Sequence, residues 1–185
     1  MLQKRTDGYH EIETVLQQIS LDDIITIQAN WENGNGNIKL TTDHPELPID
    51  SSNLAFKAAE KFQENFPEAL SVRILLQKRI PFGAGLGSGS SNAASVLLAL
   101  NRLTGNHFTQ EELERQAKQL GADVPFFIRG GMAHATGIGE KLASIDQKMR
   151  LYVVVVVPEV SISTKWAYTN LRIRLTNTKN NFNLA

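Results

Sequence analysis

The sequence contains no cysteine, and its other shortages also narrow the function classes open to it. Without cysteine, the 185-residue chain can form neither disulfides nor thiolate metal sites. Its four histidines are scattered and form no His-Glu-x-x-His zinc motif. The longest apolar run, Leu151–Val157, is far shorter than the roughly 20 residues needed to span a bilayer. The N-terminus has no signal-peptide pattern, so we expect a cytoplasmic protein without a membrane partner.

Neither sign of charge is in excess, because 19 Lys and Arg residues balance 19 Asp and Glu residues. Nucleic-acid binders usually carry a basic face, and we therefore expect no nucleic-acid partner. The hydrophobic fraction of 42% is typical of a globular protein that can bury a core.

The hydrophobic pattern predicts a mixture of strands and helices, which is typical of the α+β class. Strands are expected over residues 12–19, 23–28, 38–41, 72–78, 132–136 and 141–144, and helices over 53–66, 91–103 and 109–121. Residues 122–128 are expected to be extended, and the β-branched run 150–157 to be a central strand buried on both faces. Residues 1–157 are predicted to form one domain, and residues 158–185 to begin a further, partly disordered region.

A glycine-rich loop is the most informative stretch of the sequence. It comprises Pro81, Gly83, Ala84, Gly85, Leu86, Gly87, Ser88, Gly89, Ser90, Ser91 and Asn92, together with residue 82. The four alternating glycines let main-chain amides approach an anion, and the helix that follows adds unpaired amides and a partial positive charge. The loop therefore predicts a phosphate site, although a surface loop with a helix cap is the alternative. It lacks the Gly-Lys of a Walker loop, and its glycines are out of register for a dinucleotide fingerprint.

Each of the other candidate functional residues could also have a purely structural role. Asp123 follows a helix end in an apolar segment, where it must find a donor or a cation or have a raised pKa; it could also bond to amides of a turn. Tyr9 offers a stacking face for a base and His10 can bond to a base edge, although both suit an ordinary turn. Asn53 can cap a helix. Solvated surface charge is the favoured interpretation of four cations that could reach phosphates: Lys78, Arg79, Arg129 and Lys141.

Four motifs together resemble the GHMP kinase superfamily, whose members phosphorylate small alcohols. The glycine-rich loop resembles the second motif of that superfamily. The segments 4–11, 120–127 and 135–140 resemble those of the branch that acts on a cytidine diphosphate-linked substrate, and all four motifs occur in family order.

The resemblance implies an α+β GHMP kinase N-terminal domain: a mixed sheet with helices on one side and a left-handed β-α-β crossover. It implies ATP-dependent phosphorylation, with Mg²⁺, of the 2-hydroxyl of a cytidine diphosphate-linked methylerythritol in non-mevalonate isoprenoid (terpenoid) biosynthesis. Asp123 would then be the catalytic base and contact the substrate, and the loop with Asn53 would hold ATP. Tyr9, His10 and Tyr168 would hold the cytosine, and no residue is predicted as a metal ligand.

The sequence also departs from the family pattern in two places. Family members carry an Ala-Lys-x-Asn segment before the first motif and a C-terminal domain with a third glycine-rich motif, and neither is found here. The lysine would stabilise charge near the transferred phosphoryl group. We therefore expect this chain alone to be weakly active or inactive, and to be a monomer or a weak homodimer. A non-catalytic nucleotide-binding relative and another GHMP small-molecule kinase remain the alternatives.

Overall fold

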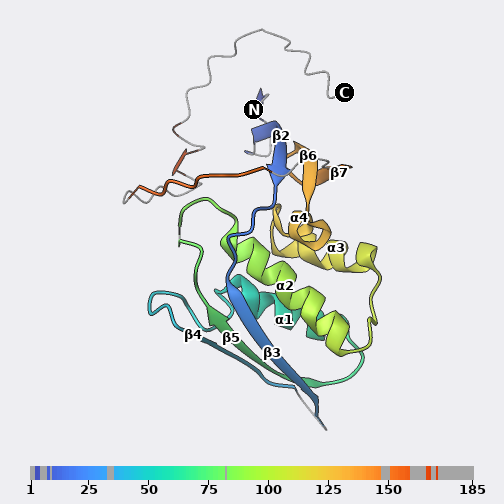
Figure 1. Ribbon diagram of the computed structural model, residues 1–185. Helices are drawn as coiled ribbons and strands as arrows, with labels where there is room; N and C mark the ends of the chain where they lie inside the picture. Colours follow the sequence, from blue (N-terminus) through green and yellow to red (C-terminus); the bar gives the residue numbers. More distant parts are fainter. Residues whose placement is uncertain are drawn as a thin grey trace.

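The computed structural model describes residues 3–4, 8, 10–32, 36–81, 83–146, 151–158, 166–167 and 170. Within these residues, two sheets lie towards opposite ends of the molecule, with a group of helices beside them (Figure 1). The chain runs from the upper sheet of Figure 1 through residues 18–23 into the lower one. No helix in the described residues is long and apolar enough to cross a membrane.

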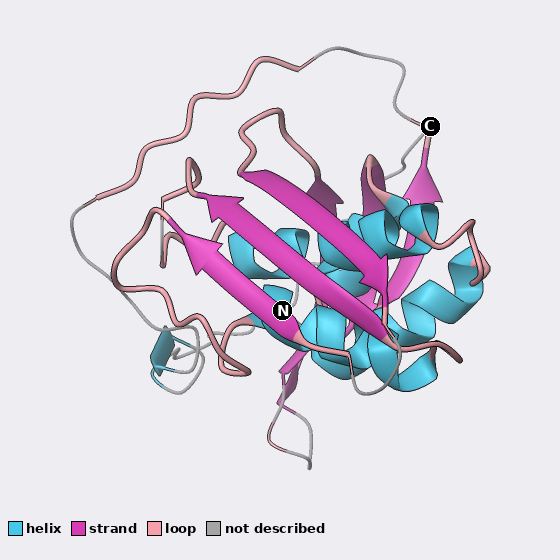
Figure 2. Ribbon diagram, turned by 90° about the horizontal axis from the view of Figure 1, so that it is seen from below, coloured by secondary structure: helices cyan, strands magenta, loops and turns pink. Residues whose placement is uncertain are grey.

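The lower sheet is built around β5 (Leu70–Gln77), which has β3 (Ile24–Trp31) on one side and β4 (Ile38–Thr42) on the other. β3 is antiparallel to β5, whereas β4 is parallel to it and is connected to it through α1 (Leu54–Asn65). The structure thus contains the β-α-β unit that the resemblance implies. Alternate residues of β5 are buried, and Figure 2 shows the helices packed against one face of this sheet.

The helices pack closely because their shared surfaces carry small side chains. α1 and α2 (Ser88–Leu103) pack against each other, and the core that they share contains five fully buried alanines: Ala55, Ala58, Ala59, Ala93 and Ala94. Phe62 of α1 fills the centre of the core, and its ring meets Phe108 edge-on with a centroid separation of 5.2 Å. α3 (Gln110–Leu120) begins with a capping box, in which Thr109 and Glu112 each satisfy a backbone amide of the other.

The upper sheet has the strand order β1 (Gln3–Lys4), β2 (His10–Gln17), β6 (Met132–Gly137) and β7 (Lys141–Ile145), and all neighbouring strands are antiparallel. Alternate residues of β6 are buried. The predicted strands 132–136 and 141–144 are therefore confirmed to within a residue.

The prediction that residues 122–128 are extended is wrong, because they include α4 (Val124–Arg129). The valine, phenylalanine and isoleucine of this segment favour a strand by intrinsic preference. Asp123 occupies the N-cap position, however, and Pro125 lies in the first turn, where its fixed φ suits a helix. Packing against α2 and α3 buries Val124 and Phe126 and decides the conformation.

The prediction of a buried central strand at residues 150–157 is also wrong for the part that is described. Residues 151–158 have no helix or strand assignment, and Tyr152 and Val154 are 97% and 89% exposed. A β-branched run has high strand propensity. A central strand, however, is buried only where neighbouring strands pair with it and other elements cover both of its faces, and no described strand pairs with this run. Residue 150 and most of 159–185 lie outside the described residues, so the division at residue 157 stays a prediction.

Candidate active site

A cavity of about 410 Å³ lies between the glycine-rich loop, the start of α2 and the chain before α1. This volume falls within the usual range of small-molecule pockets. Eleven of the predicted loop and pocket residues line it, namely Asn53, Pro81, Gly83, Ala84, Gly85, Leu86, Gly87, Ser88, Gly89, Ser90 and Asn92. Ser91 does not line it. An apolar wall that was not predicted from the sequence is added by four further residues: Leu47, Pro48, Leu54 and Leu76.

Three of the four glycines of the loop are required by its backbone conformation, whereas Gly89 lies inside α2. Gly83, Gly85 and Gly87 have φ angles of 71°, 71° and 69°, in the left-handed region that favours glycine. A Cβ at Gly87 would also lie 2.9 Å from a ring carbon of Phe127 in α4. The alternation of glycines along the loop therefore serves a specific path of the main chain.

The loop ends at the N-terminus of α2, which starts at Ser88, three residues before the predicted start. Gly87 is the N-cap, and no side chain in the described residues caps this helix. The first turn of a helix has amides without intrahelical partners and a partial positive charge. These groups border the cavity and are suited to bind phosphate oxygens.

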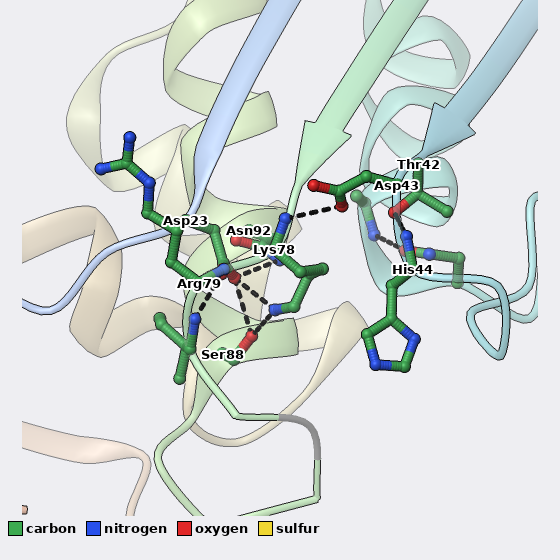
Figure 3. A network of polar contacts seen from close by, with 11 residues as sticks. Asp23, Thr42, Asp43, His44, Lys78, Arg79, Ser88 and Asn92 are labelled. Carbon is green, nitrogen blue, oxygen red and sulfur yellow. Dashed lines mark hydrogen bonds and ion pairs between the residues drawn. The ribbon is translucent and has the colours of Figure 1, made fainter.

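Beside the two ends of the loop, a buried carboxylate joins several elements (Figure 3). Asp23 forms an ion pair with Lys78, and their side chains are only 1% and 6% exposed. Asp23 also accepts hydrogen bonds from the Oγ of Ser88 at 2.9 Å and the Nδ2 of Asn92 at 3.0 Å. Burial by itself would raise the pKa of Asp23, but hydrogen bonds from Lys78, the amides of Arg79 and Ile80, and Ser88 outweigh it and lower the pKa to about 2.

Lys78 was predicted to be a solvated surface charge, and the structure contradicts this prediction. Its buried ammonium lines the cavity and pairs with Asp23. Arg129 is exposed and forms a bidentate pair with Glu114, at 2.8 and 2.6 Å, so it braces α3 against α4. The predicted preference for surface charge was wrong for Lys78. Its burial depends on Asp23, which is 55 positions away, and no local sequence signal indicates such a pairing.

Asn53 acts as the cap of α1. Its side-chain oxygen accepts from the amide of Ala55 at 2.9 Å, and its Nδ2 donates to the carbonyl of Pro48 at the same distance. Asn53 is 9% exposed and lines the cavity. Both predicted roles, helix cap and pocket residue, are thus compatible with its position.

Asp123 lies at the start of α4, one helical turn before the Phe127 ring that packs on Gly87. Its carboxylate makes no capping hydrogen bond, and the described residues show no ion pair to it. The alternative of an aspartate that bonds to turn amides is therefore not observed. The side chain reaches solvent, but the protein atoms around it displace part of its hydration, and this desolvation raises the pKa of Asp123.

The start of β2 lies near Asp123. A Cβ at Gly139 would be 3.5 Å from Ile12 and 3.8 Å from the Oδ1 of Asp123, so the turn between β6 and β7 brings β2 beside this carboxylate. His10 is two residues before Ile12 and therefore shares its face of the strand. Tyr9 and Tyr168, the other predicted cytosine-binding residues, lie outside the described residues.

Comparison with known proteins agrees with this geometry. Residues 53–131 match the family described as the GHMP kinases N terminal domain. A crystal structure of a 4-(cytidine 5'-diphospho)-2C-methyl-D-erythritol kinase superposes on 78% of this chain and 49% of its own, with a TM-score of 0.64 and 42% identity. The chain thus has the fold of a GHMP kinase N-terminal domain, and residues 53–131 match that family in sequence. A homoserine kinase from Cytophaga hutchinsonii shares the fold, with a TM-score of 0.63 and 24% identity over 83% of this chain and 53% of its own.

Two curated proteins similar to this chain have the same name. A 4-diphosphocytidyl-2-C-methyl-D-erythritol kinase from Persephonella marina is 40% identical over 91% of this chain and 60% of its own length. One from Gloeothece citriformis is 44% identical over 94% of this chain and 56% of its own length. The chain thus spans little more than half the length of these relatives.

Proposed function

We propose that this chain belongs to an ATP-dependent kinase that phosphorylates the 2-hydroxyl of 4-diphosphocytidyl-2-C-methyl-D-erythritol in isoprenoid (terpenoid) biosynthesis. The observation that best supports this function is the cavity beside the loop. It is bordered by glycines with left-handed φ angles and by the start of α2, which has no side-chain cap. Exposed amides at a helix N-terminus suit the phosphates of a nucleotide. The relatives' shared name supports the choice of acceptor, because it belongs to proteins about 40% identical to this chain.

ATP and Mg²⁺ fit the residues present. The triphosphate would lie on the amides around Gly85–Ser90, with the apolar wall of Leu47, Pro48 and Leu76 available to the adenine. Mg²⁺ in kinases binds through substrate phosphates and one or two protein oxygens and keeps several waters, so it does not need a preformed protein cage. When bound, it would neutralise charge that develops on the phosphates.

Asp123 is the proposed base. A carboxylate with a raised pKa is a better proton acceptor than an ordinary aspartate. In the proposed reaction it orients the substrate hydroxyl and takes its proton, while the hydroxyl oxygen bonds to the γ-phosphorus and ADP leaves. His10, on the neighbouring strand, would bond to the base of the cytidine group.

The decisive test is ADP release by this chain with ATP, Mg²⁺ and the cytidyl substrate. Asp123→Ala is expected to lower turnover by at least about 100-fold, the usual contribution of a general base, with ATP affinity retained. Asp22→Asn, an exposed aspartate away from the cavity, serves as the control and should match the unmodified chain. ATP binding without turnover in the unmodified chain would favour a non-catalytic nucleotide-binding role. Turnover unaffected by Asp123→Ala would exclude Asp123 as the base.

A further inference from the structure

A single carboxylate connects both ends of the glycine-rich loop. One oxygen of Asp23 accepts hydrogen bonds from the amides of Arg79 and Ile80, at 2.7 and 2.9 Å, directly before the loop begins at Pro81. The other oxygen accepts from Ser88 and Asn92, which belong to the first turns of α2, where the loop ends. Figure 3 shows these bonds converging on Asp23 from the two sides.

The partners of Asp23 come from separate elements. Asp23 precedes β3, Arg79 and Ile80 follow β5, and Ser88 begins α2, so the contacts link the sheet to the helix across 56 to 69 positions of sequence. Lys78 adds a charge-assisted contact to both Asp23 and Ser88. The network therefore holds three elements of the domain at the base of the cavity.

Stability by itself does not account for this arrangement. A buried ion pair seldom stabilises a protein more than apolar residues of similar volume would, because both charges lose their hydration. Such networks are instead able to fix one arrangement of the surrounding chain when every member is bonded. Here the groups that are fixed are the two ends of the segment that borders the cavity.

We propose that Asp23 is a positioning residue that sets the spacing between the two ends of the glycine-rich loop and so preorganises its amides for phosphate. Asp23 acts through the amides of Arg79 and Ile80 and through Ser88, and does not itself line the cavity. The role in phosphate binding rests on the proposed function, whereas the effect on the loop itself does not.

The test compares Asp23→Asn with Asp22→Asn, which removes the same charge one position earlier from an exposed side chain. Asp23→Asn is expected to accelerate amide hydrogen exchange of residues 83–91 in the ligand-free protein. We expect an increase of about 10-fold, the effect of losing a hydrogen bond to a charged group. Exchange in β2, β6 and α3 should not change, and MgATP affinity measured by calorimetry should fall by about 10-fold. Asp22→Asn should match the unmodified protein in both measurements.

The possible results separate the two ideas. Unchanged exchange of residues 83–91 in Asp23→Asn, or faster exchange spread evenly over the whole protein, would overturn the positioning role. If Asp23→Asn does not fold, Ser88→Ala removes one of the two bonds to Asp23 at the α2 end, together with the contact to Lys78, and leaves the Asn92 bond. It should give a smaller acceleration confined to the loop, and no acceleration would overturn the proposal. If the unmodified protein binds no MgATP, the proposed function fails, while loop exchange still decides the role of Asp23.

Discussion

Gly87 combines two constraints that no other residue type satisfies. Its φ angle of 69° is unfavourable for residues with a Cβ, and an added Cβ would lie 2.9 Å from the Phe127 ring. We predict that Gly87→Ala lowers the free energy of unfolding by about 1 to 3 kcal/mol, measured by urea denaturation. Gly89→Ala is the matched control. It lies inside α2, an added Cβ would be 3.5 Å from Leu54, and it should be neutral or slightly stabilising. Equal losses for both variants would contradict this account.

Asp23 also makes stability depend on pH in a defined direction. Its pKa is lowered from about 3.8 to about 2 in the folded protein, so its contribution is complete above the unfolded value and is lost as the pH falls through the folded value. The contribution amounts to about 2 kcal/mol. The difference in unfolding free energy between the unmodified protein and Asp23→Asn should therefore shrink as the pH falls from 6 towards 2. A difference that stays constant over this range would show that the charge of Asp23 is not what the network stabilises.

Among the elements, α1 depends on Asn53 at its start. We predict that Asn53→Ala costs about 1 to 2 kcal/mol of stability in urea denaturation, because the Ala55 amide loses its acceptor and the Pro48 carbonyl loses its donor. Asn53→Asp keeps the capping acceptor and adds a charge that the helix N-terminus favours, so it should cost clearly less. Equal destabilisation by the two substitutions would mean that capping is not the main role of Asn53.

Local sequence signals predicted the elements that depend on local chemistry. Three examples are the capping box of Thr109 and Glu112, the helix after Asn53 and the glycine-rich loop. In each, the residue types strongly favour the backbone conformation that is observed. The same reasoning failed where tertiary contacts decide. Residues 124–129 have strand-like composition but pack as a helix on α2 and α3, and the run 151–157 has strand propensity without a described partner.

The sequence predicted individual segments of the candidate site, but not how they are held together in the fold. Gly83–Asn92 and Asp123 carry local signals, and the structure brings both to α4, through Phe127 at Gly87 and through the position of Asp123 before Val124. Asp23 was not predicted, because an aspartate before a strand is common and its partners are 55 or more positions away. Only the folded arrangement of β3, β5 and α2 identifies it.

At the scale of the whole molecule, the domain presents two chemical surfaces close to each other. One is the cavity around the glycine-rich loop, and the other is the partly desolvated carboxylate of Asp123 beside β2 and the turn between β6 and β7. A phosphoryl donor held by the loop and an acceptor hydroxyl near Asp123 would meet between them. The central claim is therefore that the main chain of the loop binds the nucleotide.

Amide hydrogen exchange with and without MgATP tests this claim most directly, because it reports on the main-chain groups that the claim invokes. We predict that saturating MgATP slows exchange of residues 83–92 by about 10-fold or more, while residues of β7 and the C-terminal half of α3 do not change. Protection elsewhere without protection of residues 83–92, or no protection at saturating MgATP, would contradict the account.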